Sequence, residues 1–210
     1  MALLLSVLEQ GMIYGILALG VYITYKILDF PDLTVDGSFP FGAAITVRLI
    51  NGFGVPAILT LPIAFLGGAL VGICTGLIHV KLKVRDLLSG IIMMTGLYTI
   101  NLWVAGSGYV AIFDKQNIFN NSFVNSITPG FLVNFKNVII IFLITMVAKY
   151  LLDWYMSTKS GFLLRAVGDN DTIVTSLGVD KGLVKIVGLS IANGLVSLSG
   201  CIYAQQQRSF

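Results

Sequence analysis

The sequence predicts an all-α fold, a single polytopic bundle of transmembrane helices over residues 1–210. Hydrophobic residues make up 56% of the chain and charged residues 11%, whereas soluble domains carry about 25% charged residues. Apolar runs of about 20 residues, long enough to cross a bilayer, recur along the chain. A soluble protein of this composition would lack polar surface, so we expect one integral membrane domain.

The membrane segments follow from the lengths of the apolar runs. Five runs are long enough for a full crossing: 3–25, 55–80, 87–105, 138–154 and 183–204. A sixth run, 39–50, is about 12 residues long and crosses only if irregular backbone completes it. Pro31, Gly37 and Pro40 lie around its start and are expected to break a helix. We therefore expect six membrane segments, the second of them discontinuous.

Polar side chains within these segments are candidates for function. The discontinuous stretch holds Asp29, Asp32 and Asp36. Ionisable groups at membrane depth often mark functional sites, although a solvated loop with the same residues is equally compatible with the pattern. Asn101 and Asn193 lie inside apolar runs. Buried asparagines there are expected to make interhelical hydrogen bonds, with a substrate contact as the alternative.

The distribution of basic residues predicts the orientation in the membrane. Alternate loops bring Lys26, residues 79–86 and the segment from Lys149 to Lys185 to one side, and these segments are rich in Lys and Arg. The loops on the other side carry fewer basic residues: Arg48, Lys115 and Lys136. Cytoplasmic loops carry the excess of positive charge. The segment from Lys149 to Lys185 is therefore expected in the cytoplasm and the N-terminus outside.

Small residues recur at the spacing of helix–helix contacts. Gly68, Gly72 and Gly76 lie on one helical face, and Gly11 and Gly15 lie on another. Such faces let two helix backbones approach closely in lipid. We expect tight packing within the chain at both, with a contact between subunits as the alternative.

A short amphipathic helix is predicted between the last two apolar runs. Asp169 is a suitable N-cap and Gly178 a suitable terminating residue. Between them Ile173, Val174 and Leu177 form an apolar stripe at helical spacing. The polar face carries acids and hydroxyls rather than lysines, which suits a groove on a partner protein better than anionic lipid.

The sequence carries no signature of an enzyme. It contains no G-x-x-x-x-G-K-[ST] motif for ATP, no HExxH and no GxSxG. His79 is the only histidine, so no histidine-based metal site is expected, and no basic patch with interleaved aromatics suggests nucleic acid. We expect no catalytic residues, no metal and no cofactor in this chain. Any work done here would draw its energy from a partner.

Three motifs resemble a known family. The stretch RAVGDNDTIVTSLGVDKGLVKIVGLSIANGLVSLSG resembles the cytoplasmic loop and following helix of ABC importer permeases of the branched-chain amino acid and ribose type. The stretches LDFPDLTVDGSFPFGAA and GIIMMTGLYTINL resemble the subgroup of bacterial permeases for tryptophan or tyrosine. The motifs occur in the family's order and span most of the chain.

This resemblance implies a permease subunit of an ATP-driven importer in the bacterial inner membrane, acting as a homodimer on a small solute such as an aromatic amino acid. Two cytoplasmic ATPase subunits would bind ATP and Mg and dock on a coupling helix around Gly168–Gly178, and an extracytoplasmic binding protein would deliver the solute. Family members usually continue with further C-terminal helices, so part of the path and dimer interface is expected outside this chain.

The candidate site residues fall into two groups. Those expected near the substrate path, from the broken second segment and from polar or aromatic groups on neighbouring helices, are Asp32, Thr34, Asp36, Ser38, Phe39, Tyr98, Asn101 and Asn193. Those expected at the ATPase contact are Arg165, Gly168, Asp169, Asn170, Ile173, Leu177 and Gly178. Phe39 and Tyr98 are candidates for stacking on an aromatic solute.

Other functions stay open on the sequence alone. The solute of such an importer could instead be a branched-chain amino acid, a sugar or a nucleoside. An ion-coupled secondary transporter would be expected to show paired discontinuous helices, and only one broken segment is visible. A purely structural membrane subunit that anchors a partner is the remaining alternative.

Overall fold

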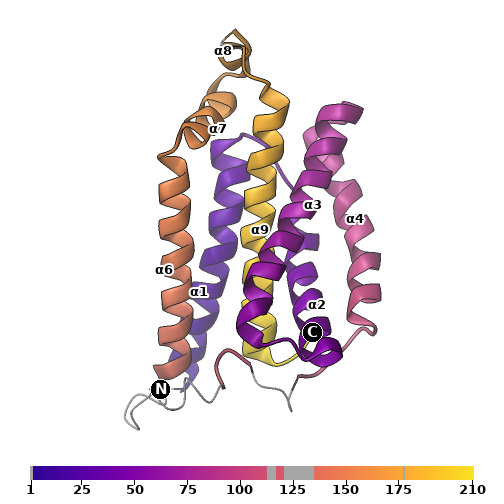
Figure 1. Ribbon diagram of the computed structural model, residues 1–210, viewed down its shortest axis with the longest axis vertical. Helices are drawn as coiled ribbons and strands as arrows, with labels where there is room; N and C mark the ends of the chain where they lie inside the picture. Colours follow the sequence, from indigo (N-terminus) through magenta and orange to yellow (C-terminus); the bar gives the residue numbers. More distant parts are fainter. Residues whose placement is uncertain (1, 113–116, 121–134, 177) are drawn as a thin grey trace.

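Helix α9 (Lys181–Gln207) is the central element of the structure, a computed structural model that describes residues 2–112, 117–120, 135–176 and 178–210. Figure 1 shows the other long helices aligned along it. Packed directly against α9 are α1 (Ala2–Tyr22), α2 (Val35–Phe53) and α3 (Thr60–Leu82). Farther out, α6 (Lys136–Met156) packs on α1, and α4 (Asp86–Ala105) packs on α2 and α3. The described residues form the predicted all-α bundle.

Five helical spans are long and apolar enough to cross a membrane. They are Leu3–Ile27, Ala57–Leu82, Asp86–Ala105, Lys136–Met156 and Lys181–Gln207. In the last, which contains α9, 67% of the apolar window is buried, against 17–33% in the other four. The outer helices therefore present most of their side chains to the surroundings, while α9 is enclosed by protein. The 19-residue helix α2 packs among them, although it is not one of the five apolar spans among the described residues.

Irregular backbone separates α1 from α2. The end of α1 widens into a π-helical turn, η1 (Ile23–Ile27), in which the N–H of Leu28 donates to the carbonyl of Ile23 at 3.0 Å. Asp29 then adopts a left-handed φ of 49°. Phe30 lies fully inside the bundle, and its ring meets the ring of His79 edge-on at 5.1 Å. The chain thus turns inward after η1 and reaches the start of α2 within the protein.

The prediction that Gly37 and Pro40 break the second segment is wrong. Helix α2 begins at Val35 and continues through both residues. Pro40 lies in its second turn, where it removes one backbone hydrogen bond. The packing of α2 against α9, α4 and α3 offsets that loss. Gly37 contributes to this packing, because a Cβ there would lie 2.8 Å from the side chain of Leu97 on α4. The discontinuity precedes α2 instead of interrupting it.

A seam of glycines brings α3 and α9 together. A Cβ at Gly68 or Gly72 would overlap the α9 backbone at Asn193 or Leu189, and one at Gly76 would lie 2.8 Å from Ile186. The expected internal packing of this face is confirmed. The same expectation for Gly11 and Gly15 is wrong, since a Cβ at either would meet no described atom within 4 Å. Their face of α1 points away from the bundle.

Two short helices, α7 (Lys159–Asp169) and α8 (Asp171–Ser176), connect α6 to α9 at one end of the bundle. Figure 1 shows this end opposite the two chain termini. The 3₁₀ turn η2 (Ala57–Leu59) opens α3 at the termini end. The loop between α3 and α4 shares the end of α7 and α8, where residues 79–86 line one cavity with residues 180–185. The basic segments expected on one side of the membrane therefore share one end.

Candidate functional site

A buried hydrogen-bonded network joins the start of α2 to the middle of α9. The side-chain nitrogen of Asn193 donates to one carboxylate oxygen of Asp32 at 2.8 Å, and the side-chain oxygen of Asn193 accepts from the hydroxyl of Ser38 at 2.6 Å. The other oxygen of Asp32 accepts the backbone N–H of Thr34 at 2.8 Å. All four side chains are buried. Since Asn193 lies near the midpoint of α9, the network lies near mid-depth of the bundle.

The network makes an acidic group tolerable at this depth. A buried carboxylate costs several kcal/mol unless donors satisfy it, and hydrogen bonds to a charged acceptor are the strong ones. Asp32 has two such donors, one from its own turn and one from α9. Thr34 extends the network to α3, because its hydroxyl lies 3.1 Å from that of Thr75. The irregular segment is thereby fastened to two helices at once.

The structure brings together four of the eight residues expected on the path, namely Asp32, Thr34, Ser38 and Asn193. Asn101 lies nearby on α4, where its side-chain nitrogen donates to the backbone carbonyl of Gly37 at 3.1 Å. This is an interhelical bond between α4 and α2. The side-chain oxygen of Asn101 is buried and has no hydrogen-bond partner among the described residues. Asp36 and Tyr98 do not belong to the buried network, because both side chains are exposed, that of Tyr98 to 69%.

Phe39 belongs to an aromatic cluster that the sequence did not reveal. Its ring stacks on Tyr14 of α1, with centroids 6.1 Å apart and 18° between planes, and tilts against Tyr203 of α9 at 5.5 Å. Tyr14 and Tyr203 also face each other at 6.1 Å. Beside Phe39 and Tyr203 lies a cavity of about 360 Å³, which Pro40, Ala43, Gln207, Ser209 and Phe210 also line. Nothing in their sequence spacing connects these three rings.

Helix α7 differs from the prediction for its region. Its first turn is capped by Thr158, whose hydroxyl accepts the N–H of Gly161 at 3.4 Å. Leu164 and Val167 are buried, and Gly168 packs directly on the carbonyl of Ile27 at the end of η1. This packing keeps the helix intact through Asp169. Gly168 is therefore an internal contact between α7 and η1, a role that its sequence context did not suggest.

The predicted capping residue of the short helix is corrected by one position. Asp169 ends α7 and does not cap α8. The side-chain oxygen of Asn170 instead accepts the N–H of Thr172 at 3.1 Å, which is the capping bond at the start of α8. At the other end Gly178 has the left-handed φ of 75° that a terminating glycine needs, and its N–H donates to the carbonyl of Thr175 at 3.1 Å.

The two faces of α8 differ in polarity. Val174 is fully buried against the protein, while Thr172, Thr175 and Ser176 are exposed. Leu177 and the side chain of Ile173, the other members of the predicted stripe, lie outside the described residues. The exposed residues Arg165, Asp169 and Asn170 lie at the same end. This end of the bundle therefore offers a short helix whose outward face is rich in hydroxyl groups.

Membrane-length helices around a buried central helix, with polar irregular backbone at mid-depth, define a multi-pass membrane protein. The sequence places it in a specific family: residues 3–210 match the family model described as the permease component of branched-chain amino acid transport systems. The chain belongs to this family of ABC importer permeases. Its membership and its membrane-length helices make it a multi-pass inner-membrane protein and point to a transport subunit.

Three relatives illustrate the range of the family. A tyrosine transport system permease protein of Clostridioides difficile is 42% identical over 203 residues, covering 96% of this chain and 64% of the relative. A probable branched-chain amino acid transport permease of Methanocaldococcus jannaschii is 26% identical, with 92% and 64% covered. A ribose import permease of Haemophilus influenzae is 25% identical, with 98% and 62% covered. No solved structure matches the chain significantly. The chain spans just under two thirds of these three relatives.

Proposed function

We propose that this chain is the membrane-spanning subunit of an ATP-driven importer and that its solute is an aromatic amino acid. The observation that carries the solute class is the Tyr14–Phe39–Tyr203 cluster beside a cavity of about 360 Å³. The relative described as a tyrosine transport permease, at 42% identity, supports the same class. ATP and Mg would be bound by separate ATPase subunits, and a binding protein would deliver the solute.

The aromatic cluster suits an aromatic ring for physical reasons. Offset or edge-to-face ring contacts contribute about 0.5–1.5 kcal/mol each beyond simple burial. Phe39 lies at the start of α2 and Tyr203 near the end of α9, so a ring held between them would touch two helices that move relative to each other if transport rearranges the bundle. The amide of Gln207, which lines the same cavity, offers a hydrogen bond to a polar substituent such as a phenol.

The buried network supplies a second part of this proposal. Asp32 and Asn193 are joined by a hydrogen bond near mid-depth of the bundle. Separation of α2 from α9 would break that bond and expose a carboxylate and an amide, groups that recognise the amino group and carboxylate of a free amino acid. The network would then act as a gate whose parts bind solute once it opens.

Reconstitution of the full-length protein tests the function. The protein, with its ATPase and binding protein, is placed in proteoliposomes and uptake of labelled solutes is measured. ATP-dependent uptake of tyrosine or tryptophan above that of leucine, ribose and a nucleoside is expected. Uptake of only a non-aromatic solute would contradict the proposal that the solute is an aromatic amino acid. Uptake driven by an ion gradient without ATP would contradict the proposal of an ATP-driven importer and indicate a secondary transporter.

Replacement of a ring of the aromatic cluster by a leucine side chain is expected to raise the KM for uptake. Phe39→Leu and Tyr203→Leu each remove a ring from the cluster, and we expect the KM for tyrosine to rise roughly 2- to 10-fold. The matched control is Phe162→Leu, since Phe162 is 62% exposed on α7. Equal KM values for all three variants and the unmodified protein would remove the cluster from the solute path.

The exposed face of α8 is the proposed contact for the ATPase, with this end of the bundle in the cytoplasm. Thr175→Arg places a long cation on that face, and we expect solute-stimulated ATP hydrolysis to fall about tenfold or more because the bulky charge opposes docking. Ser157→Arg is the control, because Ser157 is exposed at the same end but outside α8. An equal loss in both variants would show general charge sensitivity and not a specific contact.

A further inference from the structure

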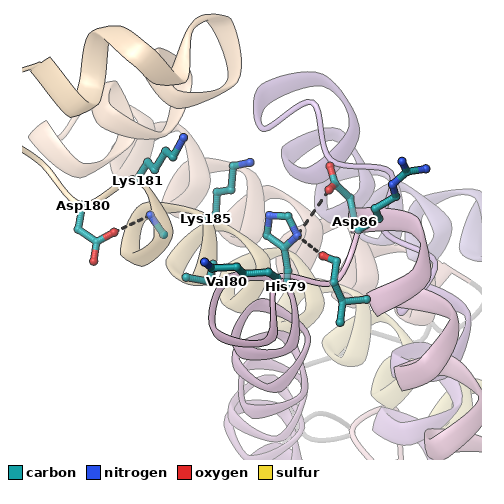
Figure 2. A pocket seen from close by; sticks show the side chains of 10 residues that line it. His79, Val80, Asp86, Asp180, Lys181 and Lys185 are labelled. Carbon is teal, nitrogen blue, oxygen red and sulfur yellow. Dashed lines mark hydrogen bonds and ion pairs between the residues drawn. The ribbon is translucent and has the colours of Figure 1, made fainter.

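A cavity of about 490 Å³ opens between the end of α3, the loop to α4 and the beginning of α9. It lies at the bundle end that carries α7 and α8, and Figure 2 shows it from close by. Lys181 and Lys185 extend from α9 on one side, and His79 and Asp86 lie on the other. The lining also includes Val80, Lys83, Val84, Arg85, Asp180 and Gly182. None of these residues belongs to the proposed solute path or to α8.

Positive charge dominates this cavity. Four cations line it, Lys83, Arg85, Lys181 and Lys185, against two carboxylates. Both carboxylates already serve the fold. One oxygen of Asp180 accepts the N–H of Gly182 at 2.8 Å and so caps α9, and an oxygen of Asp86 lies 3.5 Å from Nδ1 of His79. These two groups are held by local structure at the walls of the cavity.

Three of the cations have no acidic partner. Across the described ranges, no carboxylate lies within ion-pairing distance of Lys83, Arg85 or Lys185. They come from three different elements, the end of α3, the residue before α4 and the second turn of α9. Cations that converge from separate elements on one hollow repel one another, and an anion between them would relieve that repulsion.

We propose that this cavity binds the phosphate of an anionic phospholipid headgroup. Arg85 offers a planar fork of donors that suits two phosphate oxygens, while Lys83 and Lys185 supply point charges around it. The cavity lies at the ends of two membrane-length helices, α3 and α9, which is the level of the headgroup layer. Basic hollows between transmembrane helices are a known form of recognition for anionic lipids.

The size of the site and its position at the ends of two membrane-length helices suit a lipid headgroup. The cations line a hollow, so a phosphodiester of about the volume of a few water molecules can enter among them. Lys83 and Arg85 are also exposed, so carboxylates on a docked protein could reach them, and the experiment includes that outcome. A free phosphate shares the chemistry of the headgroup but lacks the acyl chains that hold a lipid at this level, and the experiment separates these two sources.

Lipid binding to the full-length protein in a neutral detergent tests this proposal. Native mass spectrometry measures the affinity for phosphatidylglycerol and for phosphatidylcholine with the same acyl chains, and inorganic phosphate is titrated separately. The test variant is Arg85→Gln combined with Lys185→Gln. The control, Lys26→Gln with Lys159→Gln, removes the same charge from exposed positions outside the cavity. Thermal unfolding of each variant checks that the variant is folded. If the test variant is unfolded, Lys83→Gln is combined with Lys185→Gln in its place.

We expect the unmodified protein to prefer phosphatidylglycerol to phosphatidylcholine by about tenfold or more, and the test variant to lose that preference while the control keeps it. Equal affinity for the two lipids, or an equal loss in both variants, would overturn the proposal. Binding of inorganic phosphate without preference for phosphatidylglycerol would reject the lipid source. The ATPase that co-purifies with each variant is measured in parallel, and its loss from the test variant with lipid affinity unchanged would overturn the proposal and assign the cavity to an acidic partner surface.

Discussion

Replacement of Asn193 by leucine is expected to lower the free energy of unfolding by about 3 kcal/mol. The change removes the donor to the Asp32 carboxylate and the acceptor of the Ser38 hydroxyl, both buried. Hydrogen bonds to charged groups contribute about 1.5–3 kcal/mol, and a buried polar group left without a partner costs about 1–3 kcal/mol. Leucine keeps the branched outline of asparagine but is larger and carries no polar atom, so overpacking at this fully buried position adds to the loss of the network.

Reversible unfolding in mixed micelles measures this difference. The control is Asn51→Leu, because Asn51 is exposed and its side chain makes one hydrogen bond among the described residues, to the carbonyl of Ala111 at 3.1 Å. We expect the control to change stability by less than about 1 kcal/mol. If Asn193→Leu were no more harmful than Asn51→Leu, the network would not be what holds the irregular segment to α9.

The second large effect is expected at the crossing of α2 and α9. Gly200 packs on the carbonyl of Phe39, and Gly42 packs on the carbonyl of Ser197, so each helix offers a glycine to the backbone of the other. A single methyl group at Gly200 would overlap the Phe39 carbonyl. Gly200→Ala should destabilise by about 1–3 kcal/mol through overpacking, and Gly200→Val should yield little folded protein.

Gly96→Ala provides the control for helical propensity. Gly96 lies within α4, and a Cβ there would meet no described atom within 4 Å. Since glycine inside a helix is about 0.8–1.0 kcal/mol less favourable than alanine, this change should leave stability unchanged or raise it. The melting temperature of both variants in detergent, with their yield of monodisperse protein, makes the comparison. A similar melting temperature for Gly200→Ala and Gly96→Ala would contradict the close contact.

The bundle could be predicted from the sequence because the membrane imposes simple length and polarity rules. Apolar runs mark the crossings, and the runs at 87–105 and 183–204 fall within α4 and α9. The position of the break was harder to predict. Pro40 has the wrong chemistry for a helix interior, yet α2 continues through it because contacts with three other helices offset one lost hydrogen bond. Propensity is local, whereas this outcome depends on tertiary packing.

The candidate site could be predicted only where the residue type itself is costly to bury in a membrane segment. Asp32 and Asn193 are costly to bury in an apolar setting, so their position in or beside membrane segments predicts a specific contact for each. Tyr14 and Tyr203 carry no such signal, because tyrosine is common in membrane helices and 188 positions separate them. The cap at Asn170 instead of Asp169 was missed because α7 is extended by burial of Leu164 and Val167, which a local reading of caps does not include.

The central helix has one mechanical consequence. Helix α9 has 27 residues and so is about 40 Å long, and the glycine seam holds residues 186–197 of it to α3. Its first residue follows the short link after α8, and Tyr203 lies in its last turns. A stiff rod of this length that tilts by about 5° about one end moves the other end by about 3.5 Å. That displacement is close to the thickness of an aromatic ring. A small tilt of α9 about its α8 end would therefore change the distance between the rings of Phe39 and Tyr203 by about one ring thickness.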